Sequence, residues 1–397
     1  MAQEIIRAAR EAADPPVLTK VKLHEPTFGE DEIQAVVDVL RSTMVTSGDK
    51  VREFESYFGP NAVMCNSGSS ANLLAIAALC NPLTDKRLHP GDEVIVSALS
   101  WSTTVWPLVQ HGLIPVIVDI DPDTLNIDVN QVHRAIGPRT RAVMPVHVYG
   151  NPCDMSALMI ICSDNELDLI EDCCEALGAE YDKKLVGSFG DFATFSFYFS
   201  HHITTLEGGL VIAAQSGMAE NIRILRGHGW IRDLNSEHSG YCEDHPDIDP
   251  KFLFVNMGYN LRCTEVQAAI GLVQLKKIHT FIEARRKAAY LLSIVFGRYL
   301  GWLRSQVEIP GSRSSWFGYP VVVRKEAPFS SRELRDWFES KGIETRSIIC
   351  GNIARQPGMR LFPHRVVGSL TEADMVMECG FSIGCHQDMG EAECHYV

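Results

Sequence analysis

Short apolar runs alternate with segments of helical periodicity through the first two thirds of the chain. Near-continuous apolar runs of this length are typical of strands in a sheet that is covered on both faces. The runs that predict buried strands are 62–64, 93–97, 115–119, 141–146 and 167–172. Helical periodicity between them predicts helices at 70–79, 103–109 and 129–136. This alternation favours an α/β fold with a mixed, mostly parallel sheet.

The last third of the chain has a different pattern. One long helical pattern runs from Thr264 to Tyr299, and its basic residues, including Arg285 and Arg286, are most simply a solvated face. The apolar segment 316–324 and a helical pattern at 331–338 follow it and predict a small α+β domain.

We therefore expect two domains. The large one spans residues 1–275 and begins with an arm of about 25 residues, and the small C-terminal one spans 276–397. The polar segment 233–250 predicts an excursion on the surface.

The composition of the chain limits which partners and which cellular compartment are expected. The 397 residues are 46% hydrophobic and carry a net charge of −14, which argues against nucleic acid or an anionic membrane as a partner. The apolar runs are too short to span a bilayer, and the charged start of the chain does not resemble a signal peptide. We expect a cytoplasmic protein.

Twelve cysteines need an interpretation. In a reducing compartment most are small buried hydrophobic residues. An iron–sulfur or metal site favours close pairs such as C-x-C or C-x-x-C, and the sequence has neither. The pairs Cys385-His386 and Cys394-His395 are most simply part of a frayed, solvent-facing tail, so we expect no metal.

Three segments after predicted strands could carry chemistry. Residues 66–72 are small and open a helix, which suits a phosphate, although any strand–turn–helix favours Gly and Ser. The indole of Trp101 could stack on a flat heteroaromatic ring or simply pack in the core. Asp172 ends a buried strand, where open sheets bind ligands; it could pair with a protonated ring nitrogen or form a structural cap.

A fourth segment, Ser196-Phe-Tyr-Phe-Ser-His201-His202-Ile-Thr-Thr-Leu-Glu207-Gly-Gly, is the most informative. It resembles the cofactor-lysine segment of the DegT/DnrJ/EryC1 sugar aminotransferases, in which a lysine occupies the position of His201. That lysine forms a Schiff base with pyridoxal phosphate. An imidazole cannot form one, but it can still move a proton. The difference predicts an enzyme that uses the cofactor without anchoring it.

The resemblance covers about residues 24–390 and implies a type I pyridoxal-phosphate fold that assembles as a homodimer with shared active sites. It implies a phosphate site at Ser67, Gly68, Ser69 and Ser196, completed by the partner subunit's Asn260. It also implies that Trp101 stacks on the cofactor ring, that Asp172 pairs with the ring nitrogen and that Glu175 lies near the ring hydroxyl. His228, Arg232 and Trp316 are implied substrate contacts, and the resemblance allows His228 and Arg232 to come from the neighbouring subunit.

Within the family, the sequence motifs are most similar to those of the 3-dehydratases of GDP-4-keto-6-deoxy-D-mannose. The shared segments are Ser100-Trp-Ser-Thr-Thr, Ser200-His-His-Ile, His228-Gly-Trp, Ser314-Ser-Trp-Phe-Gly and Cys350-Gly-Asn. The resemblance implies that pyridoxamine phosphate reacts with the C4 ketone of a nucleotide-linked 4-keto-6-deoxy sugar. His201 then removes a proton from the cofactor's aminomethyl carbon, the C3 hydroxyl leaves, and L-glutamate restores the pyridoxamine form.

Three alternatives remain open at this point. The first is an iron–sulfur CDP-4-keto-6-deoxyglucose 3-dehydrase, which also carries His at this position. Enzymes of that type have a cluster of cysteines, and this sequence lacks one. A TDP-sugar 3-dehydratase is the second alternative. The third is a non-catalytic family member that has lost its lysine, against which the Trp101, Asp172 and Ser196 positions count.

Overall fold

The predicted strands form the central sheet of the protein. The structure is a computed structural model that describes residues 20–84, 86–234 and 240–397. Eight strands lie in the order β1-β9-β8-β5-β4-β2-β3-β13. Their bounds are β1 Ala62–Cys65, β2 Glu93–Ser97, β3 Ile114–Val118, β4 Thr140–Met144, β5 Asp168–Asp172, β8 Phe192–Ser196, β9 Gly209–Ala213 and β13 Arg365–Val366. Each of the five strands predicted from the sequence is present.

Only β9 runs against the others in this sheet, because it pairs antiparallel with both β1 and β8, whereas the remaining neighbours are parallel. The sheet is covered on both faces, as the apolar runs predict. Within β2, Val94 and Val96 face one apolar cluster and Ile95 faces another. A mixed, mostly parallel α/β sheet is therefore confirmed.

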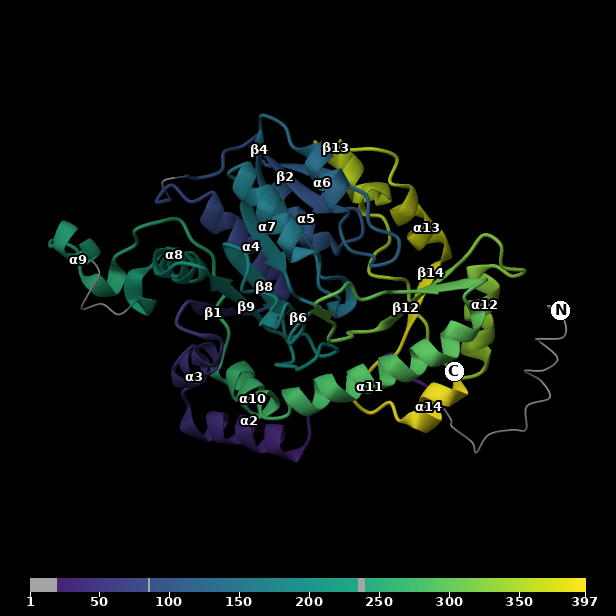
Figure 1. Cartoon of the computed structure of the whole chain (residues 1–397). Coiled ribbons are helices and arrows are strands. Elements are labelled where there is room, and N and C mark those ends of the chain that lie inside the picture. The colour runs from purple at the N-terminus through teal and green to yellow at the C-terminus, as the bar shows by residue number, and fades with distance from the viewer. Residues whose placement is uncertain (1–19, 85, 235–239) are drawn as a thin grey trace.

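Helices flank this sheet (Figure 1). α4 packs against β8 and β9 and against α5, whereas α6 packs against β3 and α7 against β5. The helices of this part are α2 Glu30–Ser42, α3 Asp49–Phe58, α4 Gly68–Leu79, α5 Ser102–Gln110, α6 Val129–Ala135, α7 Met155–Asp164, α8 Ser216–Arg226, α9 Gly240–Asp244 and α10 Glu265–Leu275. The predicted excursion 233–250 contains α9, and its residues 235–239 lie outside the described residues, as do residues 1–19 of the predicted arm.

The single long helix predicted over 264–299 is wrong in one respect, because two helices replace it. α10 ends at Leu275, and α11 runs over Ile278–Phe296. At the junction, Lys276 N–H donates to Val273 O and Lys277 N–H to Gln274 O, which are tight i→i−3 bonds. Lys277 also pairs with the buried Glu32 of α2 at 2.7 Å. Long-range anchoring therefore breaks a pattern that is locally continuous.

The C-terminal part has its own antiparallel sheet, β10-β12-β14, with helices around it (Figure 1). Its elements are β10 Leu303–Ser305, β11 Ser312–Arg313, β12 Tyr319–Val323, α12 Ser331–Ser340, α13 Thr371–Cys379, β14 Gly380–Ile383 and α14 Glu391–Tyr396; β11 joins β6 Glu180–Tyr181 and β7 Lys184–Leu185 in a third small sheet. The predicted boundary at residue 275 falls at the end of α10, and the division into two domains stays a prediction.

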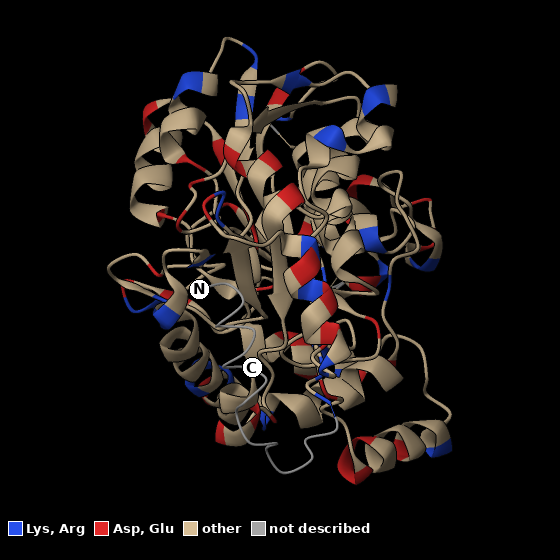
Figure 2. Cartoon of the chain, turned by 90° about the vertical axis from the view of Figure 1, so that its right-hand side faces the viewer, with Lys and Arg blue, Asp and Glu red and all other residues tan. Residues whose placement is uncertain are grey.

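The expectation of a frayed tail is wrong. Cys385 and Cys394 are fully buried, His386 is buried, and α14 packs against α11. The apolar residues of the tail complete a core that lies far away in the sequence. No helix in the described part of the chain is long and apolar enough to cross a membrane. Acidic and basic residues are interspersed over the face seen in Figure 2.

Candidate active site

A cavity of about 460 Å³ opens at the carboxyl ends of the parallel strands, where open α/β sheets bind ligands. Asp172 ends β5, Ser196 ends β8, and Ser67 and Trp101 follow β1 and β2. Eight residues singled out from the sequence line this one cavity: Ser67, Gly68, Ser69, Trp101, Asp172, Glu175, Ser196 and His201. Segments that are up to 134 residues apart (from Ser67 to His201) therefore meet, as the motif order predicts.

The N-terminus of α4 forms one wall of the cavity. Ser67 is the N-cap residue, and its Oγ accepts the Ser70 N–H at 3.1 Å. A Cβ at Gly68 would lie 2.5 Å from Ser196 Cβ, so only glycine allows this close approach. Backbone N–H groups at a helix start, with serine hydroxyls beside them, are suited to holding a phosphate.

Asp172 lies on the cavity floor with its carboxylate fixed from two sides. Oδ2 accepts from Thr104 Oγ1 at 2.8 Å and from Asn72 Nδ2 at 3.0 Å, and Oδ1 accepts the Cys174 N–H at 3.1 Å. Asn72 is itself oriented by Thr194 Oγ1 at 2.6 Å. This arrangement of donors favours an oriented carboxylate that can accept one more hydrogen bond from a ligand.

Trp101 stands at the cavity mouth. Core packing is not its role, because the residue is 53% exposed although it is a large aromatic side chain. It is the N-cap residue of α5 and lies four positions after Ser97, the last residue of β2. An exposed indole at a cavity wall is suited to stacking on a planar ring.

Glu175 is the second carboxyl group of this wall. Its Oε2 accepts the Tyr149 N–H at 2.9 Å. Burial raises the pKa of Glu175 to about 7, while the Tyr149 hydrogen bond and the charge of Arg346 act in the opposite direction. The group is therefore placed to exchange a proton near neutral pH.

His201 lies in the loop between β8 and β9, where its N–H donates to Tyr198 O at 2.9 Å and closes a turn. The imidazole faces the Phe317 ring with a centroid separation of 4.9 Å. Burial, with the charges of Arg285 and Arg346, lowers the pKa of His201 to about 3. The ring is thus neutral, and among the described residues its buried Nδ1 has no hydrogen-bond partner. A neutral imidazole with a free nitrogen can accept a proton.

Four predicted site residues do not line this cavity. Trp316 is 6% exposed and stacks on Tyr319 in the C-terminal core, so its expected substrate contact is not supported; Phe317, one position later, lines the cavity instead. His228 and Asn260 each bond to Arg262, at 3.1 and 3.2 Å, and Arg232 lies over the Trp230 ring. These last three are exposed, which leaves them accessible to a second subunit.

Sequence reasoning missed several lining residues. Asn72 and Thr104 are the donors that orient Asp172, and Arg346 is a cavity cation from the C-terminal part of the chain. Asn72 could have been found, because it lies within the small-residue segment and one turn into the helix. Arg346 carries no local signal, because its place in the cavity depends on how the C-terminal part packs on the large sheet.

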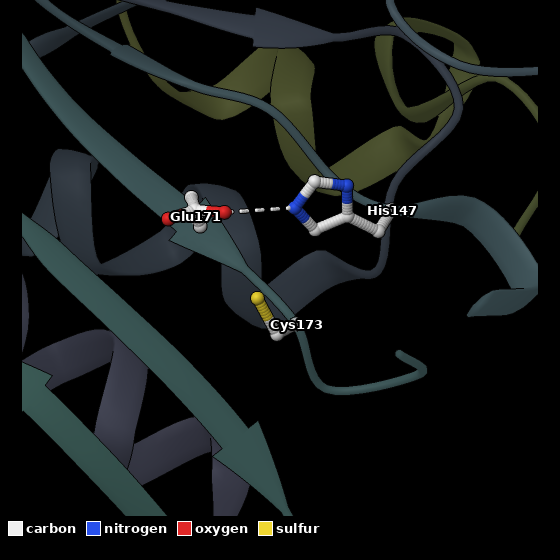
Figure 3. Close-up of side chains that lie close together, drawn as sticks. All are labelled: His147, Glu171 and Cys173. Carbon is white, nitrogen blue, oxygen red and sulfur yellow. Dashed lines mark hydrogen bonds and ion pairs between the residues drawn. The ribbon is translucent and has the colours of Figure 1, made fainter. Parts of the chain in front are cut away.

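A buried group of potential metal ligands lies beside the cavity floor (Figure 3). His147, Glu171 and Cys173 are fully buried, and their ligand atoms lie within 4.8 Å of one another. His147 Nδ1 accepts the Cys153 N–H at 3.0 Å, which leaves Nε2–H to donate to Glu171 at 3.3 Å. The Glu171 carboxylate also accepts three backbone N–H groups at 2.8 Å. These bonds already occupy the ligand atoms of His147 and Glu171, so we interpret the group as a structural anchor.

Comparison with known proteins agrees with this geometry. Residues 26–397 match the DegT/DnrJ/EryC1/StrS aminotransferase family. A GDP-4-keto-6-deoxy-D-mannose 3-dehydratase of Yersinia pseudotuberculosis is 38% identical over 386 residues, or 94% of this chain and 96% of the relative. A dTDP-4-dehydro-2,6-dideoxy-D-glucose 3-dehydratase of Saccharopolyspora spinosa is 37% identical over 96% of this chain and 85% of its own length.

A solved structure is similar over almost its whole length. It is the crystal structure of GDP-4-keto-6-deoxymannose-3-dehydratase with a trapped PLP-glutamate geminal diamine, which superimposes with a TM-score of 0.89 at 36% identity. The likeness covers 95% of this chain and 98% of that one. The chain therefore belongs to the DegT/DnrJ/EryC1/StrS aminotransferase family and has its pyridoxal-phosphate-dependent aminotransferase fold.

Proposed function

We propose that this chain is a coenzyme-B6-dependent nucleotide-sugar 3-dehydratase that removes the C3 hydroxyl of a 4-keto-6-deoxyhexose. One observation carries the proposal. A neutral histidine, His201, occupies the lysine position of an aminotransferase family in a cavity that keeps the remaining cofactor-type contacts. Relatives with 36–38% identity and this activity support it.

The cavity residues fit pyridoxamine 5'-phosphate. The α4 N-terminus with Ser67, Ser69 and Ser196 holds the phosphate, and Gly68 supplies the close approach. Trp101 stacks on the ring, and Asp172 accepts a hydrogen bond from the protonated ring nitrogen. When bound, the cofactor supplies an amino group and an electron sink.

Proton transfer is the task of His201. The imidazole would accept the proton from the aminomethyl carbon, and the imidazolium would then protonate the departing C3 oxygen. Phosphate groups bring negative charge into the cavity, which opposes the effect of Arg285 and Arg346 and raises the basicity of the imidazole. Glu175, whose pKa burial raises to about 7, would lie near the ring hydroxyl of the bound cofactor.

L-Glutamate is the proposed amino donor, because a glutamate adduct of the cofactor is trapped in the similar enzyme. The positive charge of Arg346 on the cavity wall suits an anionic donor. The proposed assembly is a homodimer in which Asn260 of the partner subunit completes the phosphate site, and the partner's His228 and Arg232 face the substrate. The proposed compartment is the cytoplasm.

The proposed substrate is GDP-4-keto-6-deoxy-D-mannose, and its product would feed colitose and O-antigen lipopolysaccharide synthesis. The sugar and nucleotide need a direct test, because a dTDP-sugar 3-dehydratase is nearly as similar as the GDP-sugar enzyme. The experiment is a turnover screen of GDP-, CDP-, UDP- and TDP-4-keto-6-deoxyhexoses with pyridoxamine phosphate and glutamate. Mass spectrometry should find a product that is one oxygen atom lighter; a 4-amino product would indicate an aminotransferase instead.

Purified protein should need neither iron nor a reductase, because the sequence has no C-x-C pair. Metal analysis and an assay without added reductase test this expectation. Absorbance bands of an iron–sulfur cluster, or activity that depends on a reductase, would favour the CDP-sugar type of enzyme. Failure to bind pyridoxamine phosphate and to consume any 4-keto sugar would favour a non-catalytic family member.

A further inference from the structure

Arg285 is the largest fully buried side chain of the described residues, at 2% exposure. It lies on α11, where the sequence pattern predicted a solvated basic face, and that prediction is wrong. Burial of a guanidinium is costly unless the charge is paired. Of the described carboxylates, only the exposed Asp388 acts on it electrostatically, and no ion pair joins the two. An unpaired charge kept in a core calls for an explanation.

Among the described residues, the side-chain hydrogen bonds of Arg285 go from Nη1 to backbone carbonyls, and its buried Nε has no partner. Nη1 donates to Cys385 O at 2.7 Å, to Phe317 O at 3.1 Å and to Trp316 O at 3.3 Å. The next residue, Arg286, donates from Nε to Ser314 O at 2.8 Å. The two arginines therefore fasten the same short segment, 314–317, to α11.

This segment forms the wall against which the two histidines lie. The Phe317 ring is 4.9 Å from the His201 ring and 6.1 Å from the His202 ring. His202 Nε2 donates to Ser315 O at 3.0 Å. Trp316 has a φ of 51°, in the left-handed region that bulky residues avoid. The segment therefore needs outside contacts to keep this shape, and Arg285 supplies two of them.

Arg285 also brings charge close to His201. Burial lowers its pKa to about 10, so it stays protonated at neutral pH, and its charge lowers the pKa of His201. The other titratable groups around His201 are Asp172, Cys174, Glu175, Tyr198, His202, Glu207 and Arg346. Those that face Arg285 are His24, Cys385, His386 and Asp388.

We propose that Arg285 is a positioning residue for the base: it locks segment 314–317 against His201 and places near the imidazole a permanent positive charge that opposes its protonation before substrate and cofactor bind. The inference rests on the proposed function of His201, and it adds a residue outside the cavity that controls this base.

Two variants separate charge from hydrogen bonding. Both variants are shorter than arginine and weaken the contacts that Nη1 makes with the carbonyls, but Arg285→Lys keeps the charge whereas Arg285→Gln removes it. The first measurement is the titration of His201 by NMR of imidazole-labelled protein without cofactor, with His201→Asn used to assign the signal. The second is the pH profile of 3-dehydration, and a thermal melt checks that each variant folds.

In Arg285→Gln, the titration midpoint of His201 should rise by about one pH unit, the usual size of the effect of a nearby charge. The acid limb of the activity profile should move to higher pH with it, because a base with a higher pKa is protonated earlier. In Arg285→Lys, the midpoint should stay within half of that change, but turnover should fall about tenfold as the Phe317 wall loosens.

An unchanged His201 midpoint in folded Arg285→Gln overturns the electrostatic part of the proposal. Wild-type turnover in Arg285→Lys overturns the claim that Arg285 holds segment 314–317 in place. This variant still tests the positioning role of Arg285 if Arg285→Gln does not fold. The NMR titration needs no activity, so it tests Arg285 even if the protein proves not to be a dehydratase. A failure of the proposed dehydratase function would appear separately, as inactivity of the wild-type protein in the substrate screen.

Discussion

The two sides of the cavity are built differently. On the floor, both carboxylate oxygens of Asp172 already have donors, and its donor Asn72 is held in turn by Thr194. Elsewhere in the cavity lining, the buried Nδ1 of His201 has no partner among the described residues, and the same holds for Nδ1 of His202, which lies outside the lining. A rigid, satisfied floor is suited to binding a planar cofactor in one orientation. An unsatisfied imidazole is suited to reactions with a proton.

The largest effect is expected from a substitution of His201. His201→Asn should lower dehydration by at least on the order of 100-fold, because an amide cannot act as the base. Cofactor binding should persist, since the proposed phosphate and ring contacts do not depend on the imidazole. Turnover of the 4-keto sugar and equilibrium binding of pyridoxamine phosphate are the two measurements. An Asn variant with wild-type turnover would remove His201 from the mechanism.

His201→Lys should replace the proposed base with an amine that anchors the cofactor. The amine should bind pyridoxal phosphate covalently, with an absorbance band that survives gel filtration, and dehydration should slow because the cofactor is held as the aldehyde. Wild-type protein treated with borohydride is the control. A reducible lysine–cofactor adduct in wild type contradicts the central role given to His201.

A substitution of Asp172 on the cavity floor should lower activity somewhat less than the loss of His201. Asp172→Asn should retain the fold and lower turnover by about 100-fold, because a neutral amide does not favour protonation of the ring nitrogen. Turnover and a thermal melt are measured together. Near-normal turnover of a folded variant would exclude Asp172 from the electron-sink role.

Thr104→Val sharpens the comparison with a smaller change. It removes the hydroxyl that donates to Asp172 Oδ2 at 2.8 Å and keeps the side-chain shape. The loss of one hydrogen bond to a buried carboxylate should cost about 1.5–3 kcal/mol of unfolding free energy. Urea denaturation measures this cost, and Thr103→Val, in which the neighbouring hydroxyl accepts only from Ser69, is the matched control.

The smallest effect concerns pH. Because the pKa of Glu175 is raised to about 7 in the folded cofactor-free protein, folding takes up a proton between its ordinary pKa of 4.5 and 7. The stability that this group contributes is fully present below pH 4.5 and is lost as pH rises through 7. Glu175→Gln should flatten this decline by on the order of 1–3 kcal/mol. Thermal melts at pH 5 and pH 8 test it, with the exposed Glu378→Gln as control; an equal decline in both variants would exclude Glu175.

Much of the cavity was predictable because its residues belong to local signals. Strand ends, the small residues before α4 and the segment around His201 can all be found in the sequence, and the parallel sheet brings the strand ends to one edge. The substitution of a histidine for a lysine is a fact of sequence alone. It predicted chemistry that the backbone does not reveal.

Tertiary structure alone decided which side chains are buried, because burial depends on partners that lie far away in the chain. The helical pattern suggests that Arg285 is solvated, yet the residue is buried and its Nη1 donates to the carbonyls of Trp316, Phe317 and Cys385. The choice of Phe317 over Trp316 at the cavity wall follows from the backbone conformation of the 314–317 segment. The sequence by itself therefore determined the fold class and singled out the proposed base, whereas long-range packing determined what surrounds that residue.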